Sequence, residues 1–130
     1  MSSVLDASAL LAYVLDEPGA ERVLAALRAG AVVAAVNWAE TLARLAELGA
    51  DPASEAVRLR TLLDGALRIA PLDEVQCVEI ARLRPTTRPL GLSLGDRACL
   101  ALGSALGLPV LTADRSWTGL GIGVRVELVR

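Results

Sequence analysis

The sequence predicts an α/β fold built on a mainly parallel sheet. Short apolar segments of strand length alternate with longer helical segments, and strands joined through helices run parallel because such crossovers are right-handed. One segment, 31–36, is apolar at every position, which is typical of a strand covered on both faces. The 130 residues, of which 54% are hydrophobic, can bury a real core. We therefore predict a single domain over residues 1–130.

Five segments have the length and composition of strands. The first is short and ends directly before Asp6, and the last alternates apolar and polar residues as an edge strand does. The predicted strands after the first are 31–36, 67–72, 108–113 and 124–129.

Helices are predicted between these strands from caps, prolines and glycines. Pro18 fits the first turn of a helix, and Ser93 begins another helix that ends near Gly107. The two prolines and the glycine of 85–92 predict a loop. The predicted helices are 7–15, 18–29, 37–48, 52–66, 73–84 and 93–106.

Composition excludes several classes of protein. Histidine is absent, which removes the usual general base, the usual zinc ligand and every Ser-His-Asp triad. The formal net charge of −2 argues against a broad electrostatic grip on nucleic acid. All 13 basic residues are arginine, the better residue for bidentate phosphate contact, but a biased genomic composition would also produce this choice. Cys77 and Cys99 are too isolated for a disulfide framework or a zinc site, and we expect Cys99 to be a buried, reduced thiol.

The sequence also bears on location. No apolar run approaches the roughly 20 residues that a membrane helix needs. The N-terminus lacks the basic segment and cleavage site of a signal peptide. We therefore expect a cytoplasmic protein with no membrane partner.

Four acidic residues interrupt apolar segments and form the candidate site. Asp6 follows the first predicted strand, Asp114 follows strand 108–113, and Glu40 lies in the first turn of the helix after 31–36. Asp96 lies in the first turn of its own helix. Because sites in open α/β sheets form beyond the carboxyl ends of the strands, these four carboxylates could meet at one edge.

Helix capping is the alternative role for each of these acids. Ser93-x-x-Asp96 and Asn37-x-x-Glu40 resemble capping boxes, and Asp6 and Asp114 could cap the helices that follow them. The other 11 acids fit a solvated surface, and two of them, Asp51 and Asp73, lie at helix boundaries.

Clustered carboxylates need a cation, because without one they repel each other and their pKa values rise. Asp and Glu oxygens suit Mg²⁺ or Mn²⁺. A metal held in this way can lower the pKa of bound water and bind phosphate oxygens. The suggested reaction is phosphodiester hydrolysis, which needs neither histidine nor a covalent nucleophile.

Several motifs together resemble the PIN-domain ribonucleases of the VapC toxin type. They occur in order over nearly the whole chain, and they are "VLDASALLAYVLDEPG", "AVNWAETLARLAELG", "GLSLGDRACLALGSALGLPVLTADRSW" and "GVRVELVR". The resemblance implies a PIN-like three-layer α/β/α sandwich and a Mg²⁺- or Mn²⁺-dependent endoribonuclease that cleaves cellular RNA. It also implies a cognate antitoxin, a segment of which occupies the active-site groove, and a homodimer.

The resemblance further implies roles for individual residues. The acids that match the family's catalytic and metal-binding quartet are Asp6, Glu40, Asp96 and Asp114. Asp6 and Asp96 would be the main metal ligands, and the other two would complete the shell, partly through water. Ser8 and Thr112 would orient carboxylates by hydrogen bonds, with a cap and a strand residue as their alternatives. Ser116 stands where many relatives carry another acid, which leaves a second metal open.

Other side chains have two open interpretations. Arg97 and Arg115 each follow a site acid and could contact RNA phosphates or the antitoxin, or pair with the carboxylates. Trp117 could stack on a base, but packing under the last loop is favoured. Trp38 and Tyr13 are predicted core or interface residues.

The rival function is a PIN-like module that binds RNA or a protein partner without cleaving anything. Retention of all four acids argues against that alternative. A phosphatase of the haloacid dehalogenase type is excluded, because it needs an Asp where Ser8 stands and a lysine that the chain lacks.

Overall fold

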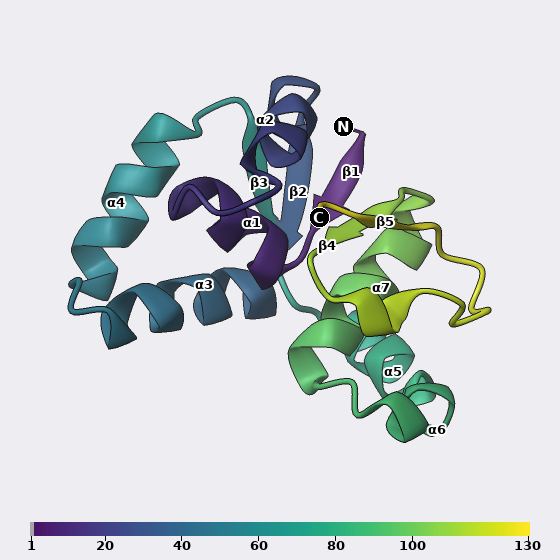
Figure 1. Ribbon diagram of the computed structural model, residues 1–130. Coiled ribbons are helices and arrows are strands. Elements are labelled where there is room, and N and C mark those ends of the chain that lie inside the picture. The colour runs from purple at the N-terminus through teal and green to yellow at the C-terminus, as the bar shows by residue number, and fades with distance from the viewer. Residues whose placement is uncertain (1) are drawn as a thin grey trace.

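A computed structural model describes residues 2–130 and contains a five-stranded sheet with the order β3-β2-β1-β4-β5 (Figure 1). All four strand pairs are parallel, so the predicted fold class is confirmed. The last strand lies at an edge, as its alternating pattern predicts. The strands are β1 (Ser3–Leu5), β2 (Ala31–Ala34), β3 (Leu67–Ala70), β4 (Val110–Thr112) and β5 (Val126–Leu128).

Helices cover both faces of the sheet and complete a three-layer α/β/α sandwich. α1 and α2 pack over one face, α7 packs over the other with α5 against it, and α3 contacts α1, α4 and α7. No helix within residues 2–130 is both long enough and apolar enough to cross a membrane. The helices are α1 (Ala7–Val14), α2 (Ala20–Arg28), α3 (Ala35–Glu47), α4 (Pro52–Leu62), α5 (Glu74–Arg82), α6 (Arg84–Thr87) and α7 (Leu94–Leu106), with the 3₁₀ turns η1 (Arg88–Leu90) and η2 (Arg115–Trp117).

The central strands are buried on both faces, which explains their continuous apolar sequences. Leu5 pairs with Val33 and Leu111, and all three side chains join the core under α1 and α2. Their neighbours Val4, Val32 and Val110 form the core on the α7 face. Because side chains alternate along a strand, one register places apolar residues in both layers.

The loop prediction for 85–92 is wrong, because the segment contains α6 and η1. Pro85 and Pro89 each lie in the first turn of their helix, where the missing N–H costs no hydrogen bond. The buried Thr87 hydroxyl donates to the Leu83 carbonyl at 2.7 Å, which ties the short helix to the end of α5.

The second helix begins later than Pro18, at Ala20, with Gly19 as its N-cap residue. Gly19 has φ +99°, and an added Cβ would lie 2.5 Å from the Val129 carbonyl oxygen. This position therefore requires glycine, and it brings the end of the chain against the start of α2.

The three inner strands are parallel, so their carboxyl ends lie at the same side of the sheet, and the candidate acids lie there. α1 begins directly after β1, α3 directly after β2, and η2 shortly after β4. The first turn of α7 reaches the same region, because α7 contacts α3, β1 and β2.

Candidate functional site

Asp6 is a buried carboxylate that accepts hydrogen bonds from three residues. It is 4% exposed and caps α1, since the Ala9 N–H donates to Oδ1 at 2.8 Å. The Thr112 hydroxyl donates to Oδ2 at 2.6 Å, and the Ser8 hydroxyl lies 2.8 and 2.9 Å from Oδ1 and Oδ2. The capping role of Asp6 is confirmed, and both predicted orienting residues contact its carboxylate.

Burial raises the pKa of Asp6 from 3.8 to about 6. The hydrogen bonds from Thr112, Ala9 and Ser8 lower this pKa and partly offset the desolvation, while the negative charge of Asp96 raises it further. Asp6 is thus close enough to Asp96 for the two charges to repel each other. A cation bound beside Asp6 would stabilise its ionised form.

Asp96 occupies the first turn of α7 and takes part in the capping box that its spacing indicates. The Asp96 N–H donates to Ser93 Oγ at 3.1 Å, and the Ser93 N–H donates to Asp96 Oδ2 at 2.9 Å. The side chain is partly exposed, in contrast to Asp6. The cap uses Oδ2 only, so it is compatible with a second role for the carboxylate.

Glu40 lies on α3 and is directed toward the start of α7. Its Oε1 accepts a hydrogen bond from Asn37 Nδ2 at 2.9 Å, and it lies against the backbone of Gly95. The predicted Asn37–Glu40 capping box is wrong, because α3 begins at Ala35 and Asn37 therefore lies inside the helix. An apolar run does not show where a strand ends and a helix starts.

The buried thiol of Cys99 lies within reach of the charges of three of the four acids. Its pKa is raised first by burial and then by the negative charges of Asp6, Asp96 and Glu40. These acids come from three separate elements, the end of β1, α3 and α7. The prediction of a buried, free thiol at Cys99 is confirmed.

Asp114 lies on the same side of the sheet but faces solvent. Its Oδ1 accepts from the backbone N–H of Ser116 at 2.9 Å and from the Ser116 hydroxyl at 2.7 Å, which caps η2. Its own N–H donates to Thr112 Oγ1 at 3.0 Å, and Thr112 donates in turn to Asp6. Asp114 is therefore linked to Asp6 through Thr112.

The two predicted arginines differ in their surroundings. Arg97 donates to the Ile80 carbonyl at 3.1 Å, which ties α7 to α5, whereas Arg115 is exposed. Within residues 2–130, neither forms an ion pair with a carboxylate. Among these residues the two arginines are not paired with the site acids, and their contact with RNA phosphates or the antitoxin stays a prediction.

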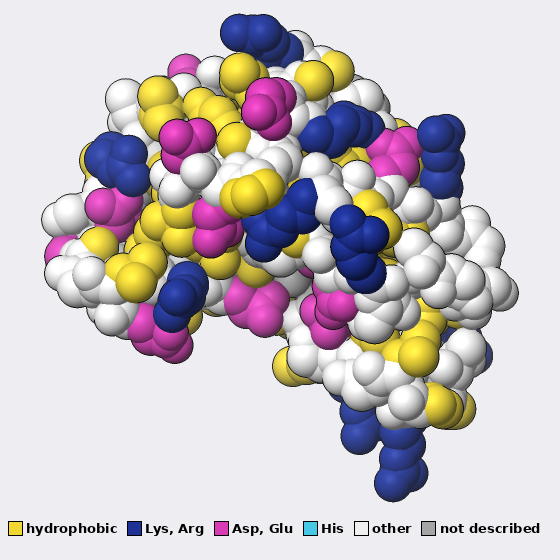
Figure 2. All heavy atoms as spheres, viewed as in Figure 1, with side chains coloured by type: hydrophobic (Ala, Val, Ile, Leu, Met, Phe, Trp, Pro, Cys, Tyr) yellow, Lys and Arg dark blue, Asp and Glu magenta, His cyan; other side chains and the backbone are white. Residues whose placement is uncertain are grey.

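Sequence reasoning missed two other arginines that border the site. Arg44 on α3 and Arg130 at the chain end line a hollow of about 310 Å³ together with Ser8, Glu40 and Glu17. Figure 2 shows basic and acidic side chains interspersed over one face rather than gathered into a continuous basic surface. The position of Arg44 four residues after Glu40 was a usable signal, but nothing in the sequence places Arg130 here.

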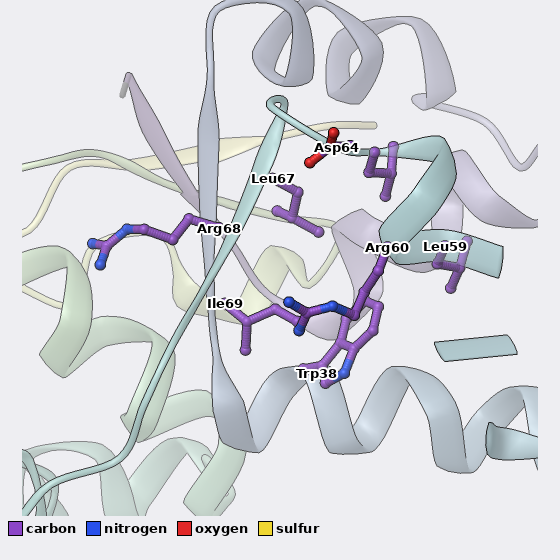
Figure 3. A pocket seen from close by; sticks show the side chains of 8 residues that line it. Trp38, Leu59, Arg60, Asp64, Leu67, Arg68 and Ile69 are labelled. Carbon is purple, nitrogen blue, oxygen red and sulfur yellow. The ribbon is translucent and has the colours of Figure 1, made fainter. Parts of the chain in front are cut away.

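Both tryptophans pack in or against the core. Trp117 is fully buried in the core on the α7 face, so packing rather than base stacking is confirmed. Trp38 packs against the opposite core and lines a hollow of about 260 Å³ beside α4 and β3, as does Arg60 (Figure 3). None of the four candidate acids lines this hollow.

The donor atoms fit a hydrated hard cation better than a closed metal cage. Within residues 2–130, no three His, Cys, Asp or Glu side chains are already placed to enclose an ion. Mg²⁺ commonly takes only one or two carboxylates and keeps several waters. A buried carboxylate beside a second one, with hydroxyls bonded to the first, meets that requirement.

Comparison with known proteins identifies the family. The PIN domain family matches residues 3–121, and no curated protein matches the sequence. A toxin–antitoxin complex from Klebsiella pneumoniae is 18% identical with a TM-score of 0.73, covering 99% of this chain and 98% of that one. FitAcB from Neisseria gonorrhoeae is 24% identical (TM-score 0.67; 95% of both chains), and the sarcin-ricin loop cleaving toxin VapC20 from Mycobacterium tuberculosis is 17% identical (0.71; 95% and 99%). The chain belongs to the PIN domain family, and it shares the fold of these three structures.

Proposed function

We propose that this protein is a divalent-metal-dependent endoribonuclease and the toxin of a toxin–antitoxin pair. One observation carries the proposal: three carboxylates from separate elements lie close together. Asp6 is buried, with the charge of Asp96 near enough to raise its pKa, and Glu40 packs against Gly95, the residue before Asp96. That arrangement is unfavourable without a cation. The PIN fold and the toxins that share it support the choice of RNA as substrate.

Asp6 and Asp96 are the proposed main ligands of Mg²⁺ or Mn²⁺, and Glu40 and Asp114 would complete the shell, partly through water. When bound, such a metal supplies charge stabilisation at a phosphoryl group and a water of lowered pKa. Burial of Asp6 increases its attraction to a cation, because the surroundings screen charge poorly.

Ser8 and Thr112 are proposed to hold the Asp6 carboxylate in one orientation. Both hydroxyls lie within 3.0 Å of its oxygens, and Ser8 Oγ also accepts from the Ala113 N–H at 2.9 Å. This network joins the end of β1 to the end of β4. A fixed carboxylate loses less entropy when it binds a metal.

RNA is proposed to approach through the hollow beside Glu40 and Ser8. Arg44 and Arg130 border this hollow, and a phosphate there would compete with their partners, Glu47 for Arg44 and the Pro18 carbonyl for Arg130. The Arg97 side chain donates instead to α5, at the Ile80 carbonyl. Arg115, which is exposed beside Asp114, is a further candidate. A net charge of −2 does not favour binding of RNA over the whole surface of the protein. Contact through a local pair of arginines is consistent with that charge.

The proposed partners are a cognate antitoxin and a second copy of the chain. Several structures with this fold are toxin–antitoxin complexes, including one from Klebsiella pneumoniae. Large apolar side chains are exposed directly after α3, at Leu48, and on α4, at Val57 and Leu62. A partner that covers such residues would gain hydrophobic stabilisation. A cytoplasmic location is proposed to match the RNA substrate.

The test is cleavage of purified cellular RNA, with the cut ends mapped by sequencing. We expect cleavage at a few positions with Mg²⁺ or Mn²⁺ and none in excess chelator. Asp96→Asn should abolish cleavage, because it removes the negative charge that would bind the metal. Asparagine keeps an acceptor for the Ser93 N–H, so the helix cap should remain.

The matched control is Asp73→Asn, which changes an exposed N-cap aspartate at the start of α5. This variant should cleave like the wild type. Cleavage that persists in chelator would refute the metal mechanism. RNA binding without any cleavage by the folded wild type would favour the non-catalytic module.

A further inference from the structure

Asn37 is a buried polar residue whose side chain joins two elements of the site. It is 1% exposed, and its Nδ2 donates to Glu40 Oε1 at 2.9 Å and to the Gly95 carbonyl at 2.9 Å. The two acceptors lie on different helices, α3 and α7. Asn37 therefore connects the Glu40 carboxylate to the turn of α7 that carries Asp96.

Gly95 provides the space for this contact. It is buried, and a Cβ added to it would lie 2.3 Å from Glu40 Oε1 and 2.5 Å from Glu40 Cδ. The Glu40 carboxylate thus packs directly against the backbone of α7, one residue before Asp96. Any larger residue at this position would force the carboxylate to move.

The Glu40 side chain does not pair with the arginine that lies one turn further along its own helix. Arg44 lies four residues further along α3, the spacing at which a Glu and a following Arg stabilise a helix. Arg44 instead pairs with Glu47 at 3.0 Å, and within residues 2–130 no ion pair involves Glu40. The bonds that Asn37 makes hold Glu40 toward α7 although an attractive partner lies on its own helix.

We propose that Asn37 and Gly95 are positioning residues that fix Glu40 beside Asp96, so that the metal meets both carboxylates at a set spacing. The inference rests on the proposed function, since it concerns the same metal. Neither residue contacts the metal. Asn37 orients Glu40 by a hydrogen bond, and Gly95 does so by leaving room.

Gly95→Ala is the sharpest test, because it removes no acid and no hydrogen-bonding side chain. Alanine favours a helix more than glycine does, so the helix itself should be no less stable. We expect Mn²⁺ to bind the metal-free protein about 10-fold more weakly by isothermal titration calorimetry, the lower end of the range for residues that orient metal ligands. Asn37→Leu, of similar volume, should weaken Mn²⁺ binding to a similar extent.

A double-mutant cycle separates positioning from general packing. In a Glu40→Ala background, Asn37→Leu should have no further effect on Mn²⁺ affinity, because the carboxylate through which it acts is gone. Thr41→Val is the matched control. The Thr41 hydroxyl donates to the Asn37 backbone carbonyl at 2.9 Å, so its loss should lower thermal stability and leave Mn²⁺ affinity unchanged.

The outcomes distinguish this inference from the proposed function. If the wild type binds no Mn²⁺, the metal-dependent function itself fails. If the wild type binds Mn²⁺ and Asp96→Asn does not, but Gly95→Ala binds it as tightly as the wild type, the positioning roles are refuted. If Asn37→Leu does not fold, Gly95→Ala still decides the question.

Discussion

The start of α1 and the start of α4 carry the same local motif and differ in one physical respect. Asp6 and Asp51 are both N-cap residues whose carboxylates accept from the backbone N–H three residues on, at 2.8 and 2.9 Å. Each also accepts a serine hydroxyl, from Ser8 and Ser54 respectively. The local capping bonds of the two residues are therefore nearly equivalent, although Asp6 accepts one further hydrogen bond, from the Thr112 hydroxyl.

Their surroundings set them apart. Asp51 is exposed, and its hydrogen bonds from Ser54 lower its pKa. Asp6 is buried near Asp96, and desolvation outweighs its hydrogen bonds and raises its pKa to about 6. A capping motif therefore does not distinguish a structural acid from a site acid. The two acids differ in the free-energy cost of burying a charged carboxylate. At Asp6 the capping hydrogen bonds do not offset this cost in full, and a bound cation can offset the rest.

The largest expected effect comes from making the same substitution at both positions. Asp6→Asn should reduce RNA cleavage roughly 100-fold or more, because the metal's contribution is worth several kcal/mol. Asp51→Asn should leave cleavage unchanged, since asparagine caps as well as aspartate does. Initial rates on one RNA substrate at saturating Mn²⁺ measure both. Equal losses in the two variants would contradict the distinction.

The next effect is on the stability of the metal-free protein. The Asp6 pKa is about 6 in the folded state and 3.8 when unperturbed. The folded state therefore holds the proton more tightly, and its stabilisation is complete below about pH 4 and is lost as pH rises through 6. The loss is on the order of 3 kcal/mol, at about 1.4 kcal/mol for each pKa unit.

Urea denaturation in chelator between pH 4 and 8 measures this loss. Asp6→Asn should remove this dependence of the free energy of unfolding on pH, and the variant should be more stable than the wild type at pH 7. Added Mn²⁺ should stabilise only the wild type. A metal-free wild type that gains stability from pH 4 to 7, relative to Asp6→Asn, would contradict the raised pKa.

A smaller effect is expected at Ser93, which shares a capping box with Asp96. Ser93→Ala removes the acceptor for the Asp96 N–H and should cost about 1 kcal/mol in the free energy of unfolding. Asp96 keeps its charge, so Mn²⁺ affinity should change less than threefold, a bound of roughly 0.6 kcal/mol. Thermal denaturation and calorimetry on one preparation separate the two quantities. If Ser93→Ala lost as much Mn²⁺ affinity as Asp96→Asn, the prediction would be wrong, and the Ser93 cap would be part of the metal site.

The smallest effect is expected at Asp51. Because its pKa is lowered, its stabilisation is present above the unperturbed value of 3.8 and is lost as pH falls through the folded pKa. Asp51→Ala should lower the melting temperature by a few degrees at pH 7 and by less at pH 3. An unchanged melting temperature at pH 7 would show that this cap contributes nothing measurable.

The layout of the fold could be predicted because its signals are local. The all-apolar run 31–36 predicts a strand buried on both faces, and Val32 and Val33 do enter opposite cores. The start of α3 could not be predicted, because Ala35 and Val36 are equally apolar in either element. The short helix at Pro85 was missed, because prolines that break a helix interior are tolerated in a first turn.

The site could be predicted only in part, for a similar reason. Asp6 and Glu40 follow strands, and this order is enough to expect them at one edge. The Asn37–Gly95 hydrogen bond joins residues 58 positions apart, and a glycine carries no side chain to signal it. The burial that separates Asp6 from Asp51 is likewise a property of the folded chain.

The most direct test of the central claim is to locate Mn²⁺ by its anomalous scattering in crystals of the wild-type protein. An ion about 2.1 Å from carboxylate oxygens of both Asp6 and Asp96, and none at Asp51, is the result that we predict. Crystals soaked at saturating Mn²⁺ that show no ion at this pair, or an ion bound elsewhere, would contradict it.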